Sequence, residues 1–408
     1  MRVAVVLGTR PEAVKLAPVI VALRRSEHEV VVVSTGQHRD LLAPILRMFD
    51  IVPDVDLDLR GHGRDLATAT GTALIRTASA LAPLGLDAVI VQGDTLTTLA
   101  GALAGFQLGI PVVHVEAGLR TDDLRSPFPE EGHRRMVTRI SDLHLAPTEH
   151  AASRLRAEGV PAERVVVTGN TGIDALLSAV ARDLPFEGAA GDAAARLAAI
   201  EAAPGPMLLV TVHRREAWDA GVADVAAAVR QLLDRHPPLY AVLPLHPNPI
   251  VRDAVVPVLA DHRRAVLTEP VGYADMVRLL RRADLVLTDS GGLQEEACTL
   301  GVPVLVTRST TERPEGEAAG GLRVVGTDPA RIVAEVGRLL DDPLAREALR
   351  CTSLPFGDGR AADRVVRALD LLTGPQAEPR PAAHATPASP AGPAGPASPA
   401  CPDVVVAV

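Results

Sequence analysis

Cysteines and aromatic residues are scarce in this 408-residue sequence. The three cysteines are odd in number and lie far apart in the chain, so the sequence predicts neither a disulfide framework nor a metal site built on cysteine. Aromatic residues make up only 2% of the chain, whereas 47% of the residues are hydrophobic. The cores must therefore be built from alanine, valine and leucine, and there is enough apolar material to exclude disorder along the whole chain.

Long apolar runs are also absent. No segment approaches the ~18 consecutive apolar residues that indicate a membrane-spanning helix. The apolar run at residues 2–7 is followed at once by Arg10, Glu12 and Lys15, which interrupt it before it reaches the length of a signal peptide. We therefore expect a cytoplasmic protein with no membrane partner.

Positive charge does not exceed negative charge in this chain. There are 41 lysines and arginines against 50 aspartates and glutamates, which gives a formal net charge of −9. This balance argues against nucleic-acid binding, although local cations could still hold an anionic small molecule. Lys15 is the only lysine, a bias that a GC-rich coding sequence would produce. A single lysine on that background suggests a function that arginine cannot supply.

What the sequence does contain is a repeated alternation of strand-length apolar runs with helix-period segments. The runs lack polar alternation, which is typical of parallel strands buried on both faces of a sheet. A first set of strands is expected at 2–7, 28–34, 87–92, 111–115, 142–146 and 164–168. A second set is expected at 206–212, 239–244, 264–268, 284–288, 302–306 and 322–325.

The two sets predict an α/β fold with two doubly wound, Rossmann-like parallel-sheet domains that face a central cleft. We expect the first domain at 1–169 and the second at 170–358, with the hinge near 169–205. Ligands in such folds sit beyond the carboxyl ends of the strands, so the site should lie in the cleft. Residues 374–408 are rich in proline, alanine and glycine and are expected to be a disordered tail.

Two segments have the composition of anion-binding helix starts. Arg10 follows the first strand in the motif GTRPE, and Lys15 comes three residues after that motif, where free backbone N–H groups and the helix dipole could hold an anion. The alternative interpretation is a solvated helix end. Later in the chain, Ser290, Gly291 and Gly292 follow a strand and could present bare N–H groups to a phosphate. The dinucleotide fingerprint, a nucleotide-hydrolysis P-loop and metal-ligand spacings are absent, so no cofactor or metal is predicted.

Titratable side chains also gather after strands. Asp94 and Glu116 follow two successive strands, and carboxylates in those places can face one cleft. Asp94 could instead cap the following helix. Glu130 opens a helix after a proline-rich loop, where it could lie over the cleft or simply pair with the helix dipole. His213 ends the first strand of the second set, beside two arginines, and suggests a proton donor at an anion site.

The order of these motifs along the chain resembles the non-hydrolysing UDP-N-acetylglucosamine 2-epimerases. The resemblance runs from residue 1 to about 372 and includes GTRPEAVKLAPV, GDTLTT, HVEAGLRT, PEE, GNTGIDAL, HRRE, DSGGLQEEA, GVPVLVTRSTTERPEG and VGTD. It implies the two-domain architecture of the GT-B glycosyltransferases, with a helix at 359–373 that crosses back to the first domain. It also implies a homodimer that interconverts UDP-GlcNAc and UDP-ManNAc through 2-acetamidoglucal, for use in polysaccharide biosynthesis.

The resemblance assigns roles to individual residues. Asp94, Glu116 and Glu130 would be the acid/base carboxylates near the sugar C2, and His213 would assist the departure of UDP. The UDP-sugar would be bound by Arg10, Lys15, Val271, Met276, Ser290, Gly291, Gly292, Glu296 and Arg313. A second UDP-GlcNAc could act as an activator in segments that contain Gln37, His38, Arg214 and His246.

Four positions differ from the usual family pattern. Asn is usual where His133 and Ala217 stand, an aromatic residue is common at Met276, and Gln or Glu often occupies Asp40. Three alternatives remain open at this level. They are a hydrolysing epimerase that releases ManNAc and UDP, a glycosyltransferase of the same fold, and a UDP-sugar sensor that has lost catalysis.

Overall fold

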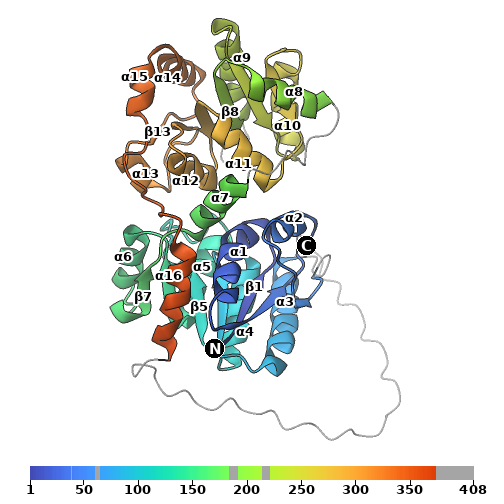
Figure 1. The fold of residues 1–408 in the computed structure, drawn as a ribbon, viewed down its shortest axis with the longest axis vertical. Coiled ribbons are helices and arrows are strands. Elements are labelled where there is room, and N and C mark those ends of the chain that lie inside the picture. Colours follow the sequence, from blue (N-terminus) through green and yellow to red (C-terminus); the bar gives the residue numbers. More distant parts are fainter. Residues whose placement is uncertain (38, 60–64, 183–191, 214–220, 374–408) are drawn as a thin grey trace, which may run out of the picture.

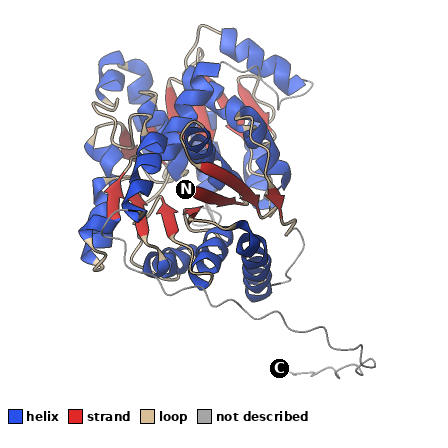
Figure 2. Ribbon diagram, turned by 60° about the horizontal axis from the view of Figure 1, so that its bottom comes forward, coloured by secondary structure: helices blue, strands red, loops and turns tan. Residues whose placement is uncertain are grey.

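Two separate parallel sheets confirm the expected fold class. The computed structural model describes residues 1–373 except 38, 60–64, 183–191 and 214–220, so the expected tail lies outside the described residues. The seven-stranded sheet has the order β3-β2-β1-β4-β5-β6-β7, and the six-stranded sheet has the order β10-β9-β8-β11-β12-β13 (Figures 1 and 2). Both orders reverse direction in the middle of the sheet, as in doubly wound folds.

All the strands expected from the sequence are present, each within two residues of its expected ends. The first sheet contains β1 (Arg2–Leu7), β2 (Glu29–Ser34), β4 (Ala88–Gln92), β5 (Val112–Val115), β6 (Leu143–Ala146) and β7 (Val165–Val167). The second contains β8 (Met207–Thr211), β9 (Tyr240–Pro244), β10 (Ala265–Thr268), β11 (Leu285–Thr288), β12 (Val304–Val306) and β13 (Leu322–Val324). The sequence analysis missed β3 (Val55–Asp56), an edge strand of only two residues.

A strand that is apolar on both faces contributes side chains to two cores, and β1 is an example. Val3, Val5 and Leu7 point into one core, while Ala4 and Val6 point into another on the opposite face. The first face is covered by α1 (Arg10–Arg24), α2 (Arg39–Met48), α7 (Thr171–Arg182) and α16 (Ala361–Ala368), and the second by α3 (Leu66–Leu81), α4 (Leu96–Gln107) and α5 (Glu130–Ile140). Beside β7 lies α6 (Glu149–Ala157).

The second sheet is covered in the same way. One face packs on α9 (Gly221–Arg235), α10 (Pro249–Leu259) and α14 (Pro329–Asp341), and the other on α8 (Asp192–Ala202), α11 (Tyr273–Arg282) and α12 (Gly291–Thr299). The short helices α13 (Pro314–Ala318) and α15 (Pro343–Ala348) lie toward the far edge of the sheet. Within the described residues, no helix combines the length and the apolar character that crossing a membrane requires.

Within the described residues, the chain passes between the two sheets twice, and the two passages touch. The first enters α7, and the second enters α16, which packs against α1 and α7 on the first sheet (Figure 1). The backbone N–H of Asn170 in the first passage donates to the carbonyl of Phe356 in the second at 2.8 Å. The Asp174 carboxylate on α7 accepts from the backbone N–H groups of Ala361 and Ala362, at 3.2 and 2.8 Å, and so caps α16.

A buried carboxyl group connects the starts of α1 and α4. Glu12 is 1% exposed and accepts hydrogen bonds from the backbone N–H groups of Gly8 and Thr9, both at 2.7 Å. The hydroxyl of Thr95, which precedes α4, donates to the same carboxyl group. Burial raises the pKa of Glu12 against these donors. The GTRPE turn therefore fixes the relative position of the two helices that begin at the carboxyl ends of β1 and β4.

Candidate active site at the junction of the two sheets

A cavity of about 290 Å³ lies where the two sheets face one another. Its lining includes residues from both domains, and several are ones that the sequence analysis selected. From the first domain come Lys15, Asp94, Glu116 and Glu130, and from the second comes Arg313. The structure therefore brings the three expected carboxylates together with two of the expected cations, and we call this space the carboxylate cavity.

Glu116 lies directly after β5 and is held from two sides. Its φ of 62° is in the left-handed region, which is uncommon for a residue other than glycine and marks local backbone strain. The ammonium group of Lys15 donates to Oε1, and the amide of Gln92 donates to Oε2. Burial acts to lower the pKa of Lys15, but the charges of Glu116 and Glu295 outweigh it and raise that pKa.

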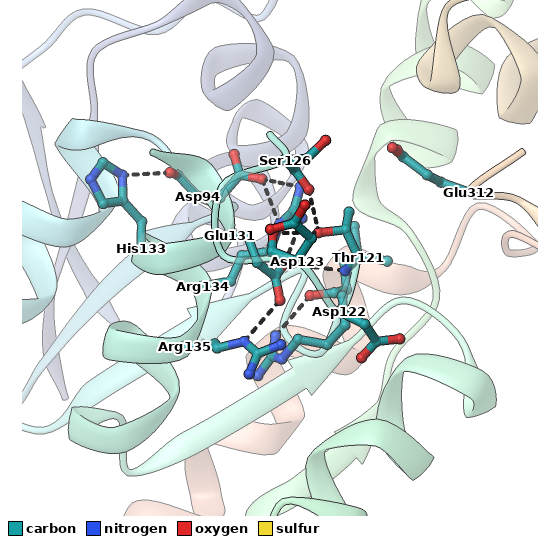
Figure 3. Close-up of polar contacts among 12 residues, drawn as sticks. Asp94, Thr121, Asp122, Asp123, Ser126, Glu131, His133, Arg134, Arg135 and Glu312 are labelled. Carbon is teal, nitrogen blue, oxygen red and sulfur yellow. Dashed lines mark hydrogen bonds and ion pairs between the residues drawn. The ribbon is translucent and has the colours of Figure 1, made fainter. Parts of the chain in front are cut away.

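Asp94 does not cap α4, so the alternative interpretation of this residue is wrong. The cap is Thr95, whose hydroxyl accepts from the backbone N–H of Thr98 at 3.2 Å. The Asp94 side chain instead pairs with Arg134 from α5, with Nη2 2.7 Å and Nε 2.8 Å from Oδ2 (Figure 3). His133, where the family usually has Asn, places Nδ1 2.9 Å from the Asp94 carbonyl oxygen.

Glu130 is the first residue of α5, so it lies near the positive end of the helix dipole and also lines the cavity. Its Oε2 is buried and has no hydrogen-bond partner among the described residues. The neighbouring Glu131 is completely buried, and it binds Arg134 and Arg135 at 3.0 and 2.9 Å. Arg134 was not predicted from the sequence as part of the site, and Glu131, which precedes it by one helical turn, was given no role there.

His213 lies in a different cavity from the three carboxylates. This second space of about 200 Å³ is lined by Arg10, His213, His246, Val271 and Met276 among others, and we call it the histidine cavity. The sequence analysis expected all of these residues to contact the same or a second UDP-sugar. These residues are instead divided between two spaces, the first with many acidic and basic side chains in its lining and the second lined largely by apolar ones.

A buried carboxylate orients His213. Asp289 follows β11 and is completely buried. Its Oδ2 accepts from the His213 backbone N–H at 2.7 Å, and its Oδ1 lies 2.9 Å from Nδ1 of the ring. The ring stacks on His246, with centroids 5.9 Å apart and planes 16° apart. Burial and the neighbouring His213 lower the pKa of His246.

The start of α12 brings together the expected phosphate and ribose residues. Ser290 is the N-cap residue directly before this helix but makes no side-chain capping hydrogen bond, and a Cβ on Gly291 would lie 3.1 Å from Nη2 of Arg313. Arg313 itself donates from Nε to Glu295. Burial, with the charge of Glu295 added, raises the pKa of Glu296 to about 7. Gly292 and Glu296 lie on the same helix, within its first two turns.

The remaining residues expected at the site are Arg10 and the residues of the expected activator site. Burial lowers the pKa of Arg10, against the opposing charge of Glu296. Gln37 accepts a hydrogen bond from the Thr97 hydroxyl at 3.3 Å and is absent from the lining of both cavities. Of the other expected activator residues, His246 lies in the histidine cavity, while His38 and Arg214 fall outside the described residues.

Comparison with known proteins gives a consistent result. Residues 21–370 match the family model described as UDP-N-acetylglucosamine 2-epimerase. The UDP-N-acetylglucosamine 2-epimerase of Salmonella typhimurium is 44% identical over 370 residues, which cover 90% of this chain and 98% of that protein. The enzyme of the same name from Bacillus subtilis is 41% identical, with coverage of 90% and 95%.

Solved structures agree with the sequence matches. The UDP-GlcNAc 2-epimerase of Neisseria meningitidis bound to UDP-GlcNAc superposes with a TM-score of 0.82 at 38% identity, covering 90% of this chain and 99% of that one. The Methanocaldococcus jannaschii enzyme in complex with UDP-GlcNAc and UDP gives 0.76 at 32% identity, covering 91% and 99%. Acinetobacter baumannii MurG, at 16% identity and a TM-score of 0.54, shares the fold alone, with coverage of 90% and 99%.

Proposed function

This chain belongs to the UDP-N-acetylglucosamine 2-epimerase family, and from that premise we propose that it interconverts UDP-GlcNAc and UDP-ManNAc without net hydrolysis. The observation that carries the proposal is the carboxylate cavity. It contains three carboxylates, Asp94, Glu116 and Glu130, on the carboxyl ends of neighbouring strands or at a helix start. An epimerisation needs acid/base groups on both faces of the carbon that inverts, and this set could supply them.

The proposed reaction needs two kinds of group, an acid/base beside C2 of the sugar and a group that stabilises UDP as it leaves C1. The hydrogen on C2 of the sugar is not acidic in the ground state. Breaking the C1–O bond to UDP builds positive charge at C1, which acidifies that hydrogen. One carboxylate then accepts the C2 proton as the C1=C2 double bond forms and UDP leaves with the bonding electrons. Protonation of C2 from the opposite face and return of UDP to C1 give the epimer.

The proposed division of labour follows the two cavities. The sugar would lie against Asp94, Glu116 and Glu130, while the uracil would lie against Val271 and Met276 in the histidine cavity. His213, oriented by Asp289, would stabilise the departing UDP. Between them, the diphosphate and ribose would contact Arg10, Lys15, Ser290, Gly291, Gly292, Glu296 and Arg313.

The domain division, the assembly and the activator are part of the same proposal. The first domain would comprise 1–169 and the returning segment 359–373, and the second 170–358. The protein would work as a cytoplasmic homodimer. Binding of a second UDP-GlcNAc by Gln37, His38, Arg214 and His246 would activate it.

NMR of UDP-GlcNAc incubated with the enzyme in D2O tests the reaction. We expect UDP-ManNAc to appear at equilibrium with the substrate, with deuterium at C2 of both sugars. Accumulation of free ManNAc and UDP would instead identify the hydrolysing reaction. A requirement for an acceptor sugar would identify a glycosyltransferase.

A further inference from the structure

One guanidinium group connects a proposed acid/base residue to a buried anion. Arg134 places Nε and Nη2 2.8 and 2.7 Å from a single oxygen of Asp94, Oδ2 (Figure 3). Its third nitrogen, Nη1, donates to Oε2 of Glu131 at 3.0 Å. All three nitrogens of the planar group are therefore engaged by two carboxylates, a geometry that lysine cannot reproduce.

The Glu131 end of this bridge is rigid. Glu131 is completely buried and also accepts hydrogen bonds from Nε of Arg135, at 2.9 Å, and from the backbone N–H of Thr121, at 3.2 Å. Glu131 and Arg134 are one turn apart on α5, so the helix sets their spacing. The guanidinium group is thus held from α5 and from the loop before it, and it has little freedom to move.

At the other end of the bridge, the Asp94 side chain is less constrained than that of Glu131. Asp94 lies between β4 and α4 with its side chain 26% exposed in the carboxylate cavity, and it does not serve as a helix cap. Arg134 occupies only Oδ2, and the structure gives Oδ1 no hydrogen-bond partner among the described residues. One oxygen is fixed, and the other is left for a ligand.

We propose that Arg134 is a positioning residue that aims Oδ1 of Asp94 at the sugar, with Glu131 as its anchor. The inference rests on the proposed function, because it concerns the group that exchanges a proton with C2. A carboxylate that rotates out of line by ~1 Å can lose ~10²-fold in rate even though the substrate still binds. The effect of losing Arg134 should therefore fall on kcat.

The experiment compares variants of the full chain in the epimerisation assay. The wild type is assayed first, because an inactive wild type would contradict the proposed function rather than this inference. Arg134→Ala should lower kcat by ~10²-fold with KM within about threefold of the wild type. Deuterium wash-in at C2, measured by NMR in D2O, should fall by the same factor.

Arg135 provides a matched control. It is the next residue on α5 and binds the same Glu131, but it is 40% exposed and makes no contact with Asp94. Arg135→Ala should keep kcat within about threefold of the wild type. Arg134→Lys, which can contact one carboxylate but not both, should recover part of the lost kcat.

Three results would overturn the inference. The first is an Arg134→Ala enzyme with kcat within threefold of the wild type. The second is a rise in KM with kcat unchanged, which would make Arg134 a substrate ligand instead. The third is an equal loss of kcat in Arg134→Ala and Arg135→Ala together with equal falls in melting temperature, since the two arginines would then support only the fold of α5.

Discussion

The two cavities differ in how they hold their polar groups. In the carboxylate cavity, Glu116 and Asp94 are each paired with a cation from a neighbouring helix, and Glu130 contacts neither cation. In the histidine cavity, a stacked pair of imidazoles lies beside Arg10 and apolar side chains, and the buried carboxylate of Asp289 orients one of the two rings, that of His213. Under the proposed function, the first cavity would exchange protons with the sugar, and the second would hold the uracil ring beside His213.

This difference separates two free energies, the activation barrier of the reaction and the binding energy of the substrate. Charges that are fixed by other charges do not have to reorganise when a reaction begins, so they can lower a barrier. An apolar pocket contributes to binding in the ground state and the transition state alike, so it changes KM more than kcat. Variants in the two cavities should therefore separate along those lines.

The largest effect is expected from Asp94→Asn. Asparagine keeps the shape of the side chain but cannot accept a proton, and a general acid/base contributes roughly 10²–10⁴-fold to a rate. Turnover and deuterium wash-in at C2 should both fall by about that factor. Because Thr95 caps α4, the helix should be unaffected, and the melting temperature serves as the control. Turnover close to that of the wild type would mean that Asp94 is not an acid/base.

His213→Asn should have a smaller effect, roughly 10–100-fold on kcat. The imidazole would stabilise the leaving UDP but would not touch C2, so the loss should be steeper for a substrate with a poorer leaving group. Binding of UDP, measured by calorimetry, should remain within a few-fold of the wild type. A large loss of UDP binding with normal kcat would make the histidine cavity a binding pocket only, and would sharpen the contrast with the carboxylate cavity.

Met276→Ala should change affinity and not rate. Removing part of the apolar wall of the histidine cavity should cost about 1 kcal/mol, roughly fivefold in KM, with kcat unchanged. Met136→Ala is the matched control, since Met136 is 48% exposed on α5 and lines neither cavity. A fall in kcat for Met276→Ala would contradict the assignment of the apolar wall to ground-state binding.

The smallest effect concerns stability and pH. The pKa of Glu296 is about 7 in the folded protein, above its ordinary value of 4.5, so unfolding releases a proton between those values. Wild-type stability should therefore fall as pH rises through that range, and the Glu296→Gln variant lacks this loss. The melting temperature of Glu296→Gln relative to the wild type should rise by a few degrees from pH 5 to pH 8.

Glu335→Gln provides the control for that titration. Burial acts to raise the pKa of Glu335, but hydrogen bonds from Arg323 and Arg338, at 2.7 and 3.1 Å, outweigh it and lower that pKa below 4.5, so Glu335 titrates mainly below the pH range of the experiment. Its melting-temperature difference from the wild type should stay constant over the same range. A flat response from Glu296→Gln as well would show that Glu296 titrates normally.

The fold could be predicted from the sequence because the central strands are runs of mainly apolar residues without polar alternation, with single buried histidines, His114 and His144, in β5 and β6. The edge strand Val55–Asp56 could not, since two residues carry no periodicity. The three carboxylates were found because each follows a strand or opens a helix, which is a local signal. Arg134 was not, because its contact with Asp94 depends on how α5 lies across the end of β4. The separation of His213 into its own cavity depends in the same way on the placement of two sheets.

Two of the cysteines are far apart in the sequence but close together in the fold. Cys298, at the end of α12, and Cys351, after α15, are both free thiols, yet both lie against Gly321. A Cβ at Gly321 would collide with the sulfur of Cys351 and lie 2.9 Å from that of Cys298. The two sulfurs therefore lie close together in the fold, although the residues are 53 positions apart in the sequence.

The hydrogen bond between Asn170 and Phe356 has a mechanical consequence. Because the only two passages between the sheets within the described residues meet there, we expect a rotation of one sheet against the other to pivot close to that hydrogen bond. Both residues also line the carboxylate cavity, so the proposed acid/base groups lie close to that point and would move little in such a rotation. The Thr148 hydroxyl donates to the Glu315 carboxylate across the junction at 2.7 Å, and this hydrogen bond would have to break before the two sheets could move apart. A small rotation could then admit a nucleotide sugar at the rim while leaving the spacing near the pivot almost unchanged.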